Sequence, residues 1–576
     1  MHDSWWHDAT VYQLYLRSFA DGDGDGIGDI AGLRSRLGYL RALGVDAIWL
    51  NPCYLSPQRD HRYDIADYFR PDPSYGTLEE LTAFVDEAHA SGLRVLMDMV
   101  ANHCSSEHSW FQEALRAEPG SPERARFIFR DGRGTHGYLP PNNWQSVFGG
   151  PAWTRVTDDR GVPEQWYFHA FDSAQPDFDW RNPEVAEMFD SVLRHWFDLG
   201  IDGFRIDVAH GLFKSAELAD WPGADDGTGG HNAAMWDQPE VHDIYRRWRA
   251  IGDDYDPPRY FVGEIWVADN ESLRRYVAPG ELHQAFTFDL LVQPWNAERM
   301  QAAIIQALRQ ADDAPAWTLS NHDVHRTVTR YGQDQLLERP DPSDMIAAAR
   351  RRGEVDMATG VRRARAAAAL QLSLPGAVFL YQGEELGLPE VFDLPDAARQ
   401  DPIWVRSAGA ELGRDGCRIP LPWTSNAPTF GFSTEPVSAA PWLPQPADFG
   451  SWAVDLQDRS ADSVLALYRR LTAARRTVFG GDSLVTWLPT GRDDVLALQR
   501  GSGVCIVNFG TEPFPIPELW SGDLVVSTQP SADASRVVDG DSAVWLVLDR
   551  VLAVEAGSVH ELPTDSPTPQ LESTVV

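Results

Sequence analysis

Short apolar runs alternate with amphipathic helical stretches over most of the chain. Residues 10–16, 45–52 and 93–100 are apolar and rich in β-branched or aromatic residues, which is typical of buried strands. Stretches with helical periodicity lie between them at 30–43 and 78–91, and each is followed by a glycine. Because near-continuous apolar strands separated by helices indicate a parallel sheet covered by helices, these residues predict successive βα units.

The same alternation resumes after residue 180. The predicted elements are, in order, a helix at 184–199, strands at 201–208, 259–266, 284–291, 315–320 and 377–381, and a final helix at 463–476. With the first three strands these make eight βα units. We therefore predict an α/β fold, a (β/α)8 TIM barrel, whose chemistry lies at the carboxyl ends of the strands.

Two stretches depart from this alternation. Residues 104–180 are rich in Gly, Pro, Asn, Trp and Phe and predict an irregular domain inserted after the third strand. From about residue 480, short β-prone runs predict a C-terminal antiparallel β-sandwich. We expect a catalytic barrel at 1–103 and 181–479, the insert at 104–180, the sandwich at 480–562, and a disordered Ser/Thr/Pro-rich tail at 563–576.

The net charge and composition of the chain limit the classes of molecule that it could bind. The formal net charge of −36 argues against binding to nucleic acid or anionic membranes and fits a neutral small molecule. We find no apolar run of the ~20 residues that span a bilayer and no secretion signal at the N-terminus. Cys53, Cys104, Cys417 and Cys505 are far apart, which suits reduced thiols and offers no disulfide or metal framework. We therefore expect a cytoplasmic protein; its oligomeric state stays open.

Polar residues collect where the predicted strands end. They are Asp98, Asn102 and His103 after the third strand, Arg205, Asp207 and His210 at the fourth, Glu264 at the fifth, Asn321, His322 and Asp323 after the seventh, and Gln382, Glu384 and Glu385 after the eighth. Any one of them could simply cap a loop. Their recurrence at most of the strands predicts an active site.

The fourth strand carries an unusual pair of charges. Arg205 and Asp207 are two positions apart, so both side chains leave one face of the strand. A guanidinium there would hold the carboxylate ionised and oriented, as a nucleophile on a sugar carbon requires. The alternative is a structural ion pair at a strand terminus.

An acidic, glycine-rich loop follows the first strand. Carboxylates at alternate positions between glycines let one tight loop direct several oxygens at a hard cation, as in the first half of an EF-hand. We expect structural Ca²⁺ here, with Asp21, Asp23, Asp25 and Asp29 as side-chain ligands and the Ile27 carbonyl as a further one. The alternative is a solvated acidic turn.

The segments at the ends of the predicted strands resemble those of the α-amylase superfamily, glycoside hydrolase family 13. Residues 98–103, 203–207, Glu264 and 321–323 are similar to its four main motifs in order, and 44–52 and 175–177 to two accessory ones. The resemblance implies that Asp207 is the nucleophile and Glu264 the general acid and then base, and that Asp323 holds the glucose hydroxyls. Carboxyl groups roughly 5–5.5 Å apart would suit double displacement with retention. No organic cofactor is implied.

Within the superfamily the chain is most similar to exo-acting α-glucosidases and oligo-1,6-glucosidases. The resemblance implies that Asp60 and Tyr63 bind the terminal glucose and that Arg418 closes the pocket. Phe148, Phe171 and Gln175 would belong to its walls, His103 and His322 would donate to sugar hydroxyls, and Arg205 would serve the nucleophile.

The sequence gives two conflicting indications of which glycosidic linkage the protein cleaves. Val208, after the nucleophile, favours α-1,6 bonds, whereas the glycine-rich stretch 211–235 favours maltose-type α-1,4 bonds. We prefer α-1,4 bonds, because one methyl group of a side chain such as Val208 changes the discrimination between two substrates by only about 1–3 kcal/mol. Gly211 departs from the Lys-His pair of α-amylases proper, and Lys214 receives no role. An α-glucosyltransferase or a sucrose isomerase or hydrolase would use the same intermediate. A non-catalytic, amylase-like transporter subunit is a remote alternative, because all three carboxylates are present.

Overall fold

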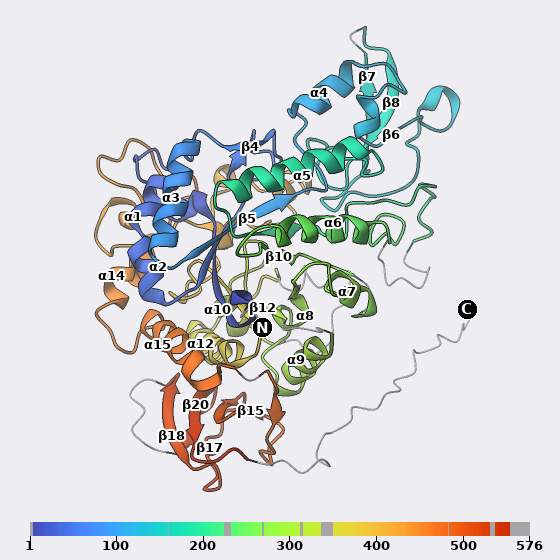
Figure 1. Ribbon diagram of the computed structural model, residues 1–576. Helices are drawn as coiled ribbons and strands as arrows, with labels where there is room; N and C mark the ends of the chain where they lie inside the picture. Colours follow the sequence, from blue (N-terminus) through green and yellow to red (C-terminus); the bar gives the residue numbers. More distant parts are fainter. Residues whose placement is uncertain are drawn as a thin grey trace, which may run out of the picture.

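Eight parallel strands close into a barrel in the computed structural model of the protein (Figure 1). The structure describes residues 4–552 except 159, 224–231, 268–269, 311–314, 336–349, 482 and 530–535. The barrel strands are β1 (Thr10–Leu14), β2 (Ala47–Leu50), β5 (Arg94–Val100), β9 (Gly203–Asp207), β10 (Tyr260–Gly263), β11 (Gln284–Thr287), β12 (Ala316–Thr318) and β13 (Ala377–Tyr381). β1 pairs with β2 on one side and β13 on the other, so the sheet closes on itself. The predicted barrel is confirmed.

Neighbouring residues of each strand face opposite sides of the barrel wall. Val11 and Trp49 pack with other side chains in the barrel interior, whereas Tyr12 and Ile48 belong to the core between strands and helices. This alternation is the period of two expected for strands, and it explains why the strand sequences are apolar at nearly every position.

Helices surround the barrel. They are α1 (Ile30–Ser35), α2 (Leu37–Leu43), α3 (Leu78–Ala90), α5 (Pro183–Asp198), α6 (Val241–Asp253), α7 (Asn270–Tyr276), α8 (Phe288–Leu291), α9 (Ala297–Gln310), α10 (Thr327–Gly332), α12 (Met357–Ser373) and α15 (Val464–Phe479). Local sequence fixes their ends: Thr77 and Glu80 form a capping box at α3, and Gly44 ends α2 at a φ of 81°. Among helices of the described residues, none is both long and apolar enough to cross a membrane.

Two predicted elements differ in detail. The single helix expected at 30–43 is divided into α1 and α2, because Arg36 leaves helical geometry with φ −110° and ψ 6°. The strand expected at 284–291 ends at Thr287, and α8 begins at Phe288. Apolar runs do not distinguish a strand from a short buried helix, which explains the second difference.

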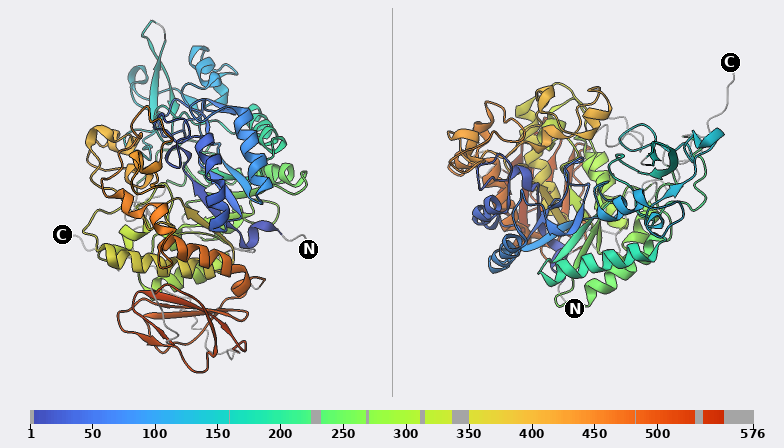
Figure 2. Two further views of the ribbon diagram at one scale, coloured as in Figure 1. Left: turned by 90° about the vertical axis from the view of Figure 1, so that its left-hand side faces the viewer. Right: turned by 90° about the horizontal axis from the view of Figure 1, so that it is seen from above.

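The segment between β5 and α5 projects from one end of the barrel (Figures 1 and 2). It contains α4 (Ser109–Arg116) and a three-stranded sheet in the order β6 (Phe129–Arg130), β8 (Pro163–Phe168), β7 (Trp153–Thr157). It therefore has more regular structure than its composition indicated. A small hairpin of β3 (Tyr54–Leu55) and β4 (Asp67–Pro71) follows β2.

Two antiparallel sheets lie at the opposite end of the molecule (Figure 2). One contains β14 (Thr486–Trp487), β15 (Val495–Arg500), β16 (Gly503–Asn508), β20 (Ser542–Leu548) and β18 (Gly522–Ser527), and the other β17 (Phe514–Pro515) and β19 (Val537–Val538). The Trp545 indole donates to the Ala369 carbonyl of α12 at 3.1 Å. The long segment between β13 and α15 contains α13 (Pro402–Arg406) and α14 (Val454–Gln457). The tail predicted at 563–576 lies outside the described residues.

Candidate active site

Arg205 lies among three carboxyl groups at the carboxyl end of the barrel. Its Nη1 donates to Asp98 Oδ1 at 2.8 Å and to Asp207 Oδ1 at 2.5 Å, and its Nη2 donates to Glu264 Oε2 at 2.6 Å. Arg205, Asp98 and Asp207 are buried, and Glu264 is partly exposed. One rigid guanidinium fork therefore fixes two carboxyl groups, those of Asp207 and Glu264, beside each other.

Strand register produces this cluster. Arg205 aligns with Asp98 of β5 and with Val262 of β10. Asp207 is the last residue of β9, and Glu264 directly follows β10, with its N–H donating to the Ile206 carbonyl at 2.9 Å. Since parallel strands end at one edge of the barrel, the sequence pattern alone brings these side chains together.

The cluster holds more negative than positive charge when all its groups are ionised. Burial raises the pKa of Asp207; Arg205 opposes this shift, and the Glu264 and Asp98 carboxylates reinforce it. Burial likewise raises the pKa of Asp98 to about 6, against Arg205. One guanidinium cannot neutralise three carboxylates, so the cluster readily holds a proton. Contrary to the expectation from the sequence, Arg205 alone therefore does not keep Asp207 ionised; an Asp207 carboxylate requires that the proton lie on Glu264 or Asp98.

Glu264 is held from two further sides. Trp266 Nε1 donates to its Oε1 at 3.2 Å, and the Val208 backbone N–H donates to its Oε2 at 3.2 Å. Trp266 is itself fixed by stacking on Phe288, with 4.1 Å between ring centroids. Val208 has a φ of 44°, which β-branched residues rarely adopt, and this turn directs its N–H at the carboxyl group.

Asp323 is the carboxylate of a second charged group. Its Oδ1 accepts from Arg414 Nη1 at 3.1 Å and from Arg418 Nη2 at 2.9 Å, and Arg414 Nη2 donates to Asp60 Oδ1 at 2.8 Å. Burial opposes ionisation of Asp323, but His322, Arg414 and Arg418 outweigh it and hold the pKa of this carboxyl well below its usual range. Asp323 is therefore an anion that can accept hydrogen bonds from hydroxyls.

Of the two arginines that contact Asp323 Oδ1, Arg414 is the one that lines the cavity. Arg418, which the resemblance implied would close the pocket, is fully buried beneath Asp323, where its Nε donates to the His322 carbonyl at 2.8 Å. Arg414 instead reaches the cavity, with its guanidinium 5.4 Å from the Phe148 ring centroid. The two arginines are four positions apart in one segment, and only the folded chain shows which one faces the cavity.

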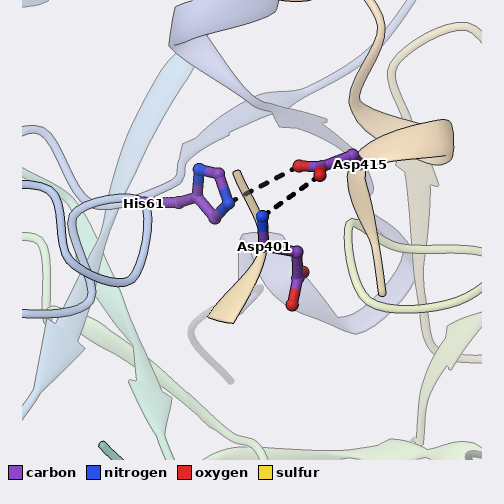
Figure 3. Close-up of side chains that lie close together, drawn as sticks. All are labelled: His61, Asp401 and Asp415. Atoms are coloured by element: carbon purple, nitrogen blue, oxygen red, sulfur yellow. Dashed lines mark hydrogen bonds and ion pairs between the residues drawn. The ribbon is translucent and has the colours of Figure 1, made fainter. Parts of the chain in front are cut away.

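His61, Asp401 and Asp415 form a buried group (Figure 3), and Asp401 contacts both arginines. His61 Nε2 lies 3.6 Å from Asp415 Oδ1, and the Asp401 N–H donates to Asp415 Oδ2 at 3.1 Å. The three side chains resemble a metal-ligand set. Arg17 Nη1, however, lies 3.4 Å from His61 Nδ1, and because a guanidinium only donates, the neutral ring carries its hydrogen on Nε2. The group does not fit a metal; Asp401 anchors Arg414 through Nε at 2.6 Å.

Two sets of hydrogen-bonded side chains lie next to the cavity and support the residues that line it. The Tyr63 hydroxyl lies 2.7 Å from His322 Nε2, and the two rings stack at 5.4 Å with 7° between their planes. His103 Nε2 lies 3.0 Å from the Tyr63 carbonyl, and Gln175 Nε2 lies 3.2 Å from both His103 Nε2 and Asp60 Oδ2. His322 and Gln175 therefore position residues that face the cavity.

A cavity of about 280 Å³ joins the two charged groups. The predicted site residues that line it are Asp60, Tyr63, His103, Phe148, Phe171, Asp207, Val208, Glu264 and Asp323. Gln175, Arg205, His322 and Arg418 lie behind this lining. Sequence analysis gave no role to Trp236, Arg350 or Arg414, which also line it. Trp236 and Arg350 belong to connecting segments without strand periodicity, so no sequence signal marked them.

Lys214 joins three parts of the chain. Its buried Nζ lies 2.6 Å from Asp177 Oδ2 and 2.7 Å from Asn102 Oδ1, and it also donates to the Gly211 carbonyl. Asp177 belongs to the projecting segment and Asn102 follows β5. The ammonium group therefore fastens the projecting segment and the connection after β9 to the barrel.

The connection after β9 also docks on the projecting segment. Asp220 accepts from Arg133 Nη1 at 2.7 Å and from the Asn143 N–H at 3.0 Å, and Trp144 Nε1 donates to the Ala219 carbonyl at 2.9 Å. Gly223 belongs to the described part, whereas Gly227, Gly229 and Gly230 of the predicted glycine-rich loop lie outside the described residues.

The acidic loop after β1 brings carboxylate oxygens together. Ligand atoms of Asp21, Asp23 and Asp29 all lie within 4.8 Å of one another. Asp21 accepts the N–H groups of Gly24 at 2.7 Å and Gly26 at 2.8 Å, which curls the loop around it. Oxygen donors at this spacing fit a hard divalent cation, with Asp21, Asp23 and Asp29 as the residues that would hold it.

The chain is similar to known proteins in sequence, and this similarity agrees with an active site in a barrel. The model of the α-amylase catalytic domain matches residues 13–479. The chain belongs to the α-amylase family. This α-amylase family chain is 36% identical to a probable α-glucosidase of Rhizobium meliloti (strain 1021), over 82% of each chain. It is 33% identical to an oligo-1,6-glucosidase of Saccharomyces cerevisiae (strain ATCC 204508 / S288c), over 76% of this chain and 78% of the relative.

Solved structures of this family are similar over nearly the whole chain. The α-glucosyl transfer enzyme XgtA has a TM-score of 0.80 at 34% identity and covers 94% of this chain and 99% of its own. The trehalulose synthase MutB of Pseudomonas mesoacidophila MX-45 has a TM-score of 0.80 at 28% identity, over 95% and 100%. The predictions of the family and of a glycoside hydrolase of the α-glucosidase type are confirmed.

Proposed function

We propose that the protein is a retaining, exo-acting α-glucosidase that releases the terminal glucose from the non-reducing end of short α-glucosides. The observation that carries this proposal is the position of Asp207 and Glu264 on one guanidinium in a cavity that the buried Asp60–Arg414 ion pair also lines, and we infer that this pair closes one end of it. A cavity closed in this way receives the end of a sugar chain rather than its middle.

In the proposed reaction, an Asp207 carboxylate oxygen attacks the anomeric carbon of the bound glucose. The bond to the leaving oxygen breaks, and Glu264 gives that oxygen its proton. Glu264 then takes a proton from water, the water oxygen attacks the anomeric carbon, and the bond to Asp207 breaks. Asp60, Asp323 and Arg414 would hold the glucose hydroxyls during both steps.

We favour maltose-type α-1,4 disaccharides as substrates. The connection after β9 docks on the projecting segment and directs Trp236 into the cavity, which supports a role for this connection in recognising the second sugar. Val208, which favours α-1,6 bonds, also lines the cavity. The test compares kcat/KM on maltose, isomaltose and sucrose and follows the first product by NMR. Preference for isomaltose by tenfold or more, reversed by Val208→Ala, would show that Val208 decides linkage.

Transfer of glucose to a sugar acceptor is the second candidate. It is supported by the similarity to an α-glucosyl transfer enzyme at 34% identity. Water and a sugar hydroxyl would compete for the same Asp207 ester. Product analysis from maltose alone distinguishes them: hydrolysis gives glucose only, and transfer gives oligosaccharides as well.

We also propose structural Ca²⁺ in the acidic loop, bound by the converging oxygens of Asp21, Asp23 and Asp29. Asp25 and the Ile27 carbonyl, which the sequence predicts as further ligands, do not belong to this converging group. When bound, the ion would neutralise the loop. No residue of the loop, all of which lies in the described part of the chain, lines the cavity, so the ion would serve folding stability.

A further inference from the structure

Arg350 lines the cavity that contains Asp207, Glu264 and Asp323, yet it belongs to no motif of the family resemblance. Its Nε donates to the Asp323 backbone carbonyl at 2.6 Å, so the guanidinium is fixed to the residue proposed to hold the glucose. Among the described residues, no acceptor or carboxylate is bonded to its two terminal amino groups. Both amino groups can only donate, so a molecule in the cavity would meet them with an oxygen acceptor.

Depth within the cavity decides what Arg350 can touch. Asp60 and Arg414, which we propose to close one end of the cavity, are buried, whereas Arg350 is partly exposed. A glucose held by Asp60, Asp323 and Arg414 would occupy the closed end. The group released from that glucose would lie nearer the mouth, on the same side as Arg350.

We propose that Arg350 is a specificity-determining residue that donates hydrogen bonds to hydroxyl oxygens of the second sugar, the group released from the terminal glucose. This inference rests on the proposed α-glucosidase function. A guanidinium fork has two terminal amino groups in one plane, a geometry that suits adjacent hydroxyl oxygens of a sugar ring.

The charge of the cavity indicates that this second sugar is neutral. Four carboxyl groups line the cavity, those of Asp60, Asp207, Glu264 and Asp323, against the guanidinium groups of Arg350 and Arg414. A phosphorylated or carboxylated sugar would meet repulsion from this excess of carboxylates.

The test compares two substrates that form the same glucosyl-enzyme. Maltose has a second sugar with hydroxyls, and p-nitrophenyl α-glucoside has an aryl group without them. Arg350→Ala should lower kcat/KM for maltose about ten- to hundredfold more than for the aryl glucoside, because it removes charge-assisted hydrogen bonds. Arg350→Lys, which retains a cation and donors, should recover part of the loss.

Arg352→Ala is the matched control. Arg352 is exposed, pairs with Asp393 at 3.3 Å and does not line the cavity, so its loss should change neither substrate. Melting temperatures of all variants show whether each is folded.

The outcomes separate the inference from the proposed function. If the unsubstituted enzyme hydrolyses neither substrate, the proposed function fails. If it hydrolyses both and Arg350→Ala and Arg350→Lys lower both equally, Arg350 only supports Asp323 and the inference is overturned. Preference for a glucoside whose second sugar is phosphorylated, lost in Arg350→Ala, would overturn the assignment of a neutral sugar.

Discussion

Asp60 and Arg414 are 354 positions apart in the chain and form a buried ion pair with 2.8 Å between Oδ1 and Nη2. The pair joins the connection between β3 and β4 to the segment after β13, and both of its residues line the cavity. Because Arg414 also contacts Asp323 and Asp401, it neutralises carboxylates that belong to three separate segments.

Arg414→Ala should reduce both stability and activity. It leaves buried carboxylates without their counter-ion, a change that typically costs about 3–5 kcal/mol, and it opens the closed end of the cavity. We expect a lower melting temperature and a fall in kcat/KM on maltose of about a hundredfold or more. Arg406→Ala, which breaks the partly exposed pair with Asp172, should cost less than about 1 kcal/mol. Equal effects of the two substitutions would contradict the role given to Arg414.

Glu264→Gln should distinguish substrates by their leaving groups. The amide cannot protonate a leaving oxygen, so hydrolysis of maltose should fall by about 10²–10⁴-fold. Formation of the glucosyl-enzyme from 2,4-dinitrophenyl α-glucoside needs no such proton and should be much less affected, which a burst measurement detects. Asp207→Asn should abolish the burst with both substrates. A burst retained in Asp207→Asn would exclude Asp207 as the nucleophile.

Lys214→Met should destabilise the protein through Asp177. The substitution leaves the fully buried Asp177 carboxylate without its ammonium partner, which predicts a loss of about 3–5 kcal/mol. Lys214→Met combined with Asp177→Asn should recover part of that loss, because the unpaired charge is then absent. Thermal melting of Lys214→Met, Asp177→Asn and the double variant gives a double-mutant cycle for the ion pair. Additive losses would show that the ion pair contributes nothing.

Glu384 predicts a pH dependence of stability. Burial raises its pKa to about 7, although the Ser320 and Tyr468 hydroxyls donate to it and lower the value. A carboxyl whose pKa is raised on folding stabilises the folded state fully below about pH 4.5, and this contribution disappears as pH rises through about 7. The lost contribution is up to about 3 kcal/mol.

The measurement compares melting temperatures at pH 5 and pH 8. The unsubstituted protein should lose more stability over this interval than Glu384→Gln, which stays neutral. Glu411→Gln, at an exposed position, is the control and should follow the unsubstituted protein. An identical pH dependence in all three proteins would show that Glu384 does not titrate in this range.

Removal of Ca²⁺ should lower the melting temperature by mass action while leaving the catalytic groups in place. Asp23→Asn should abolish the effect of a chelator, because Asp23 belongs to the group of converging oxygens. Elemental analysis of the purified protein checks that the metal is present. A melting temperature that excess chelator leaves unchanged, in protein without bound metal, would show that the loop is a solvated turn.

The carboxylates that we propose to be catalytic could be located from the sequence, because strand patterns carry positional information. Asp207 and Glu264 each stand at the end of an apolar run, and a barrel places all such ends together. Arg350 and Trp236 do not stand at the end of a strand. The position of each depends on how a connecting segment folds over the barrel, which local periodicity does not encode.

Contacts between segments far apart in the chain could not be predicted from the sequence either. Lys214 binds Asp177, whose position depends on how the projecting segment docks. The predicted helix is divided at Arg36, although the two glycines of this stretch, Gly32 and Gly38, lie within α1 and α2. The choice between Arg414 and Arg418 depended on the short helical turn at Asp415–Arg418, which places one arginine towards the cavity and the other beneath Asp323.

Closure of the barrel between its first and last strands sets a condition on the nascent chain. Thr10 of β1 aligns with Val378 of β13, so one edge of β1 has no partner strand until the ribosome has made nearly 380 residues. At roughly 5–20 residues per second, this interval lasts roughly 20–75 s. During that time the edge of β1 is open to pairing with other chains, and a cell that makes this enzyme must protect it, by chaperone binding or by slow initiation that keeps neighbouring nascent chains apart.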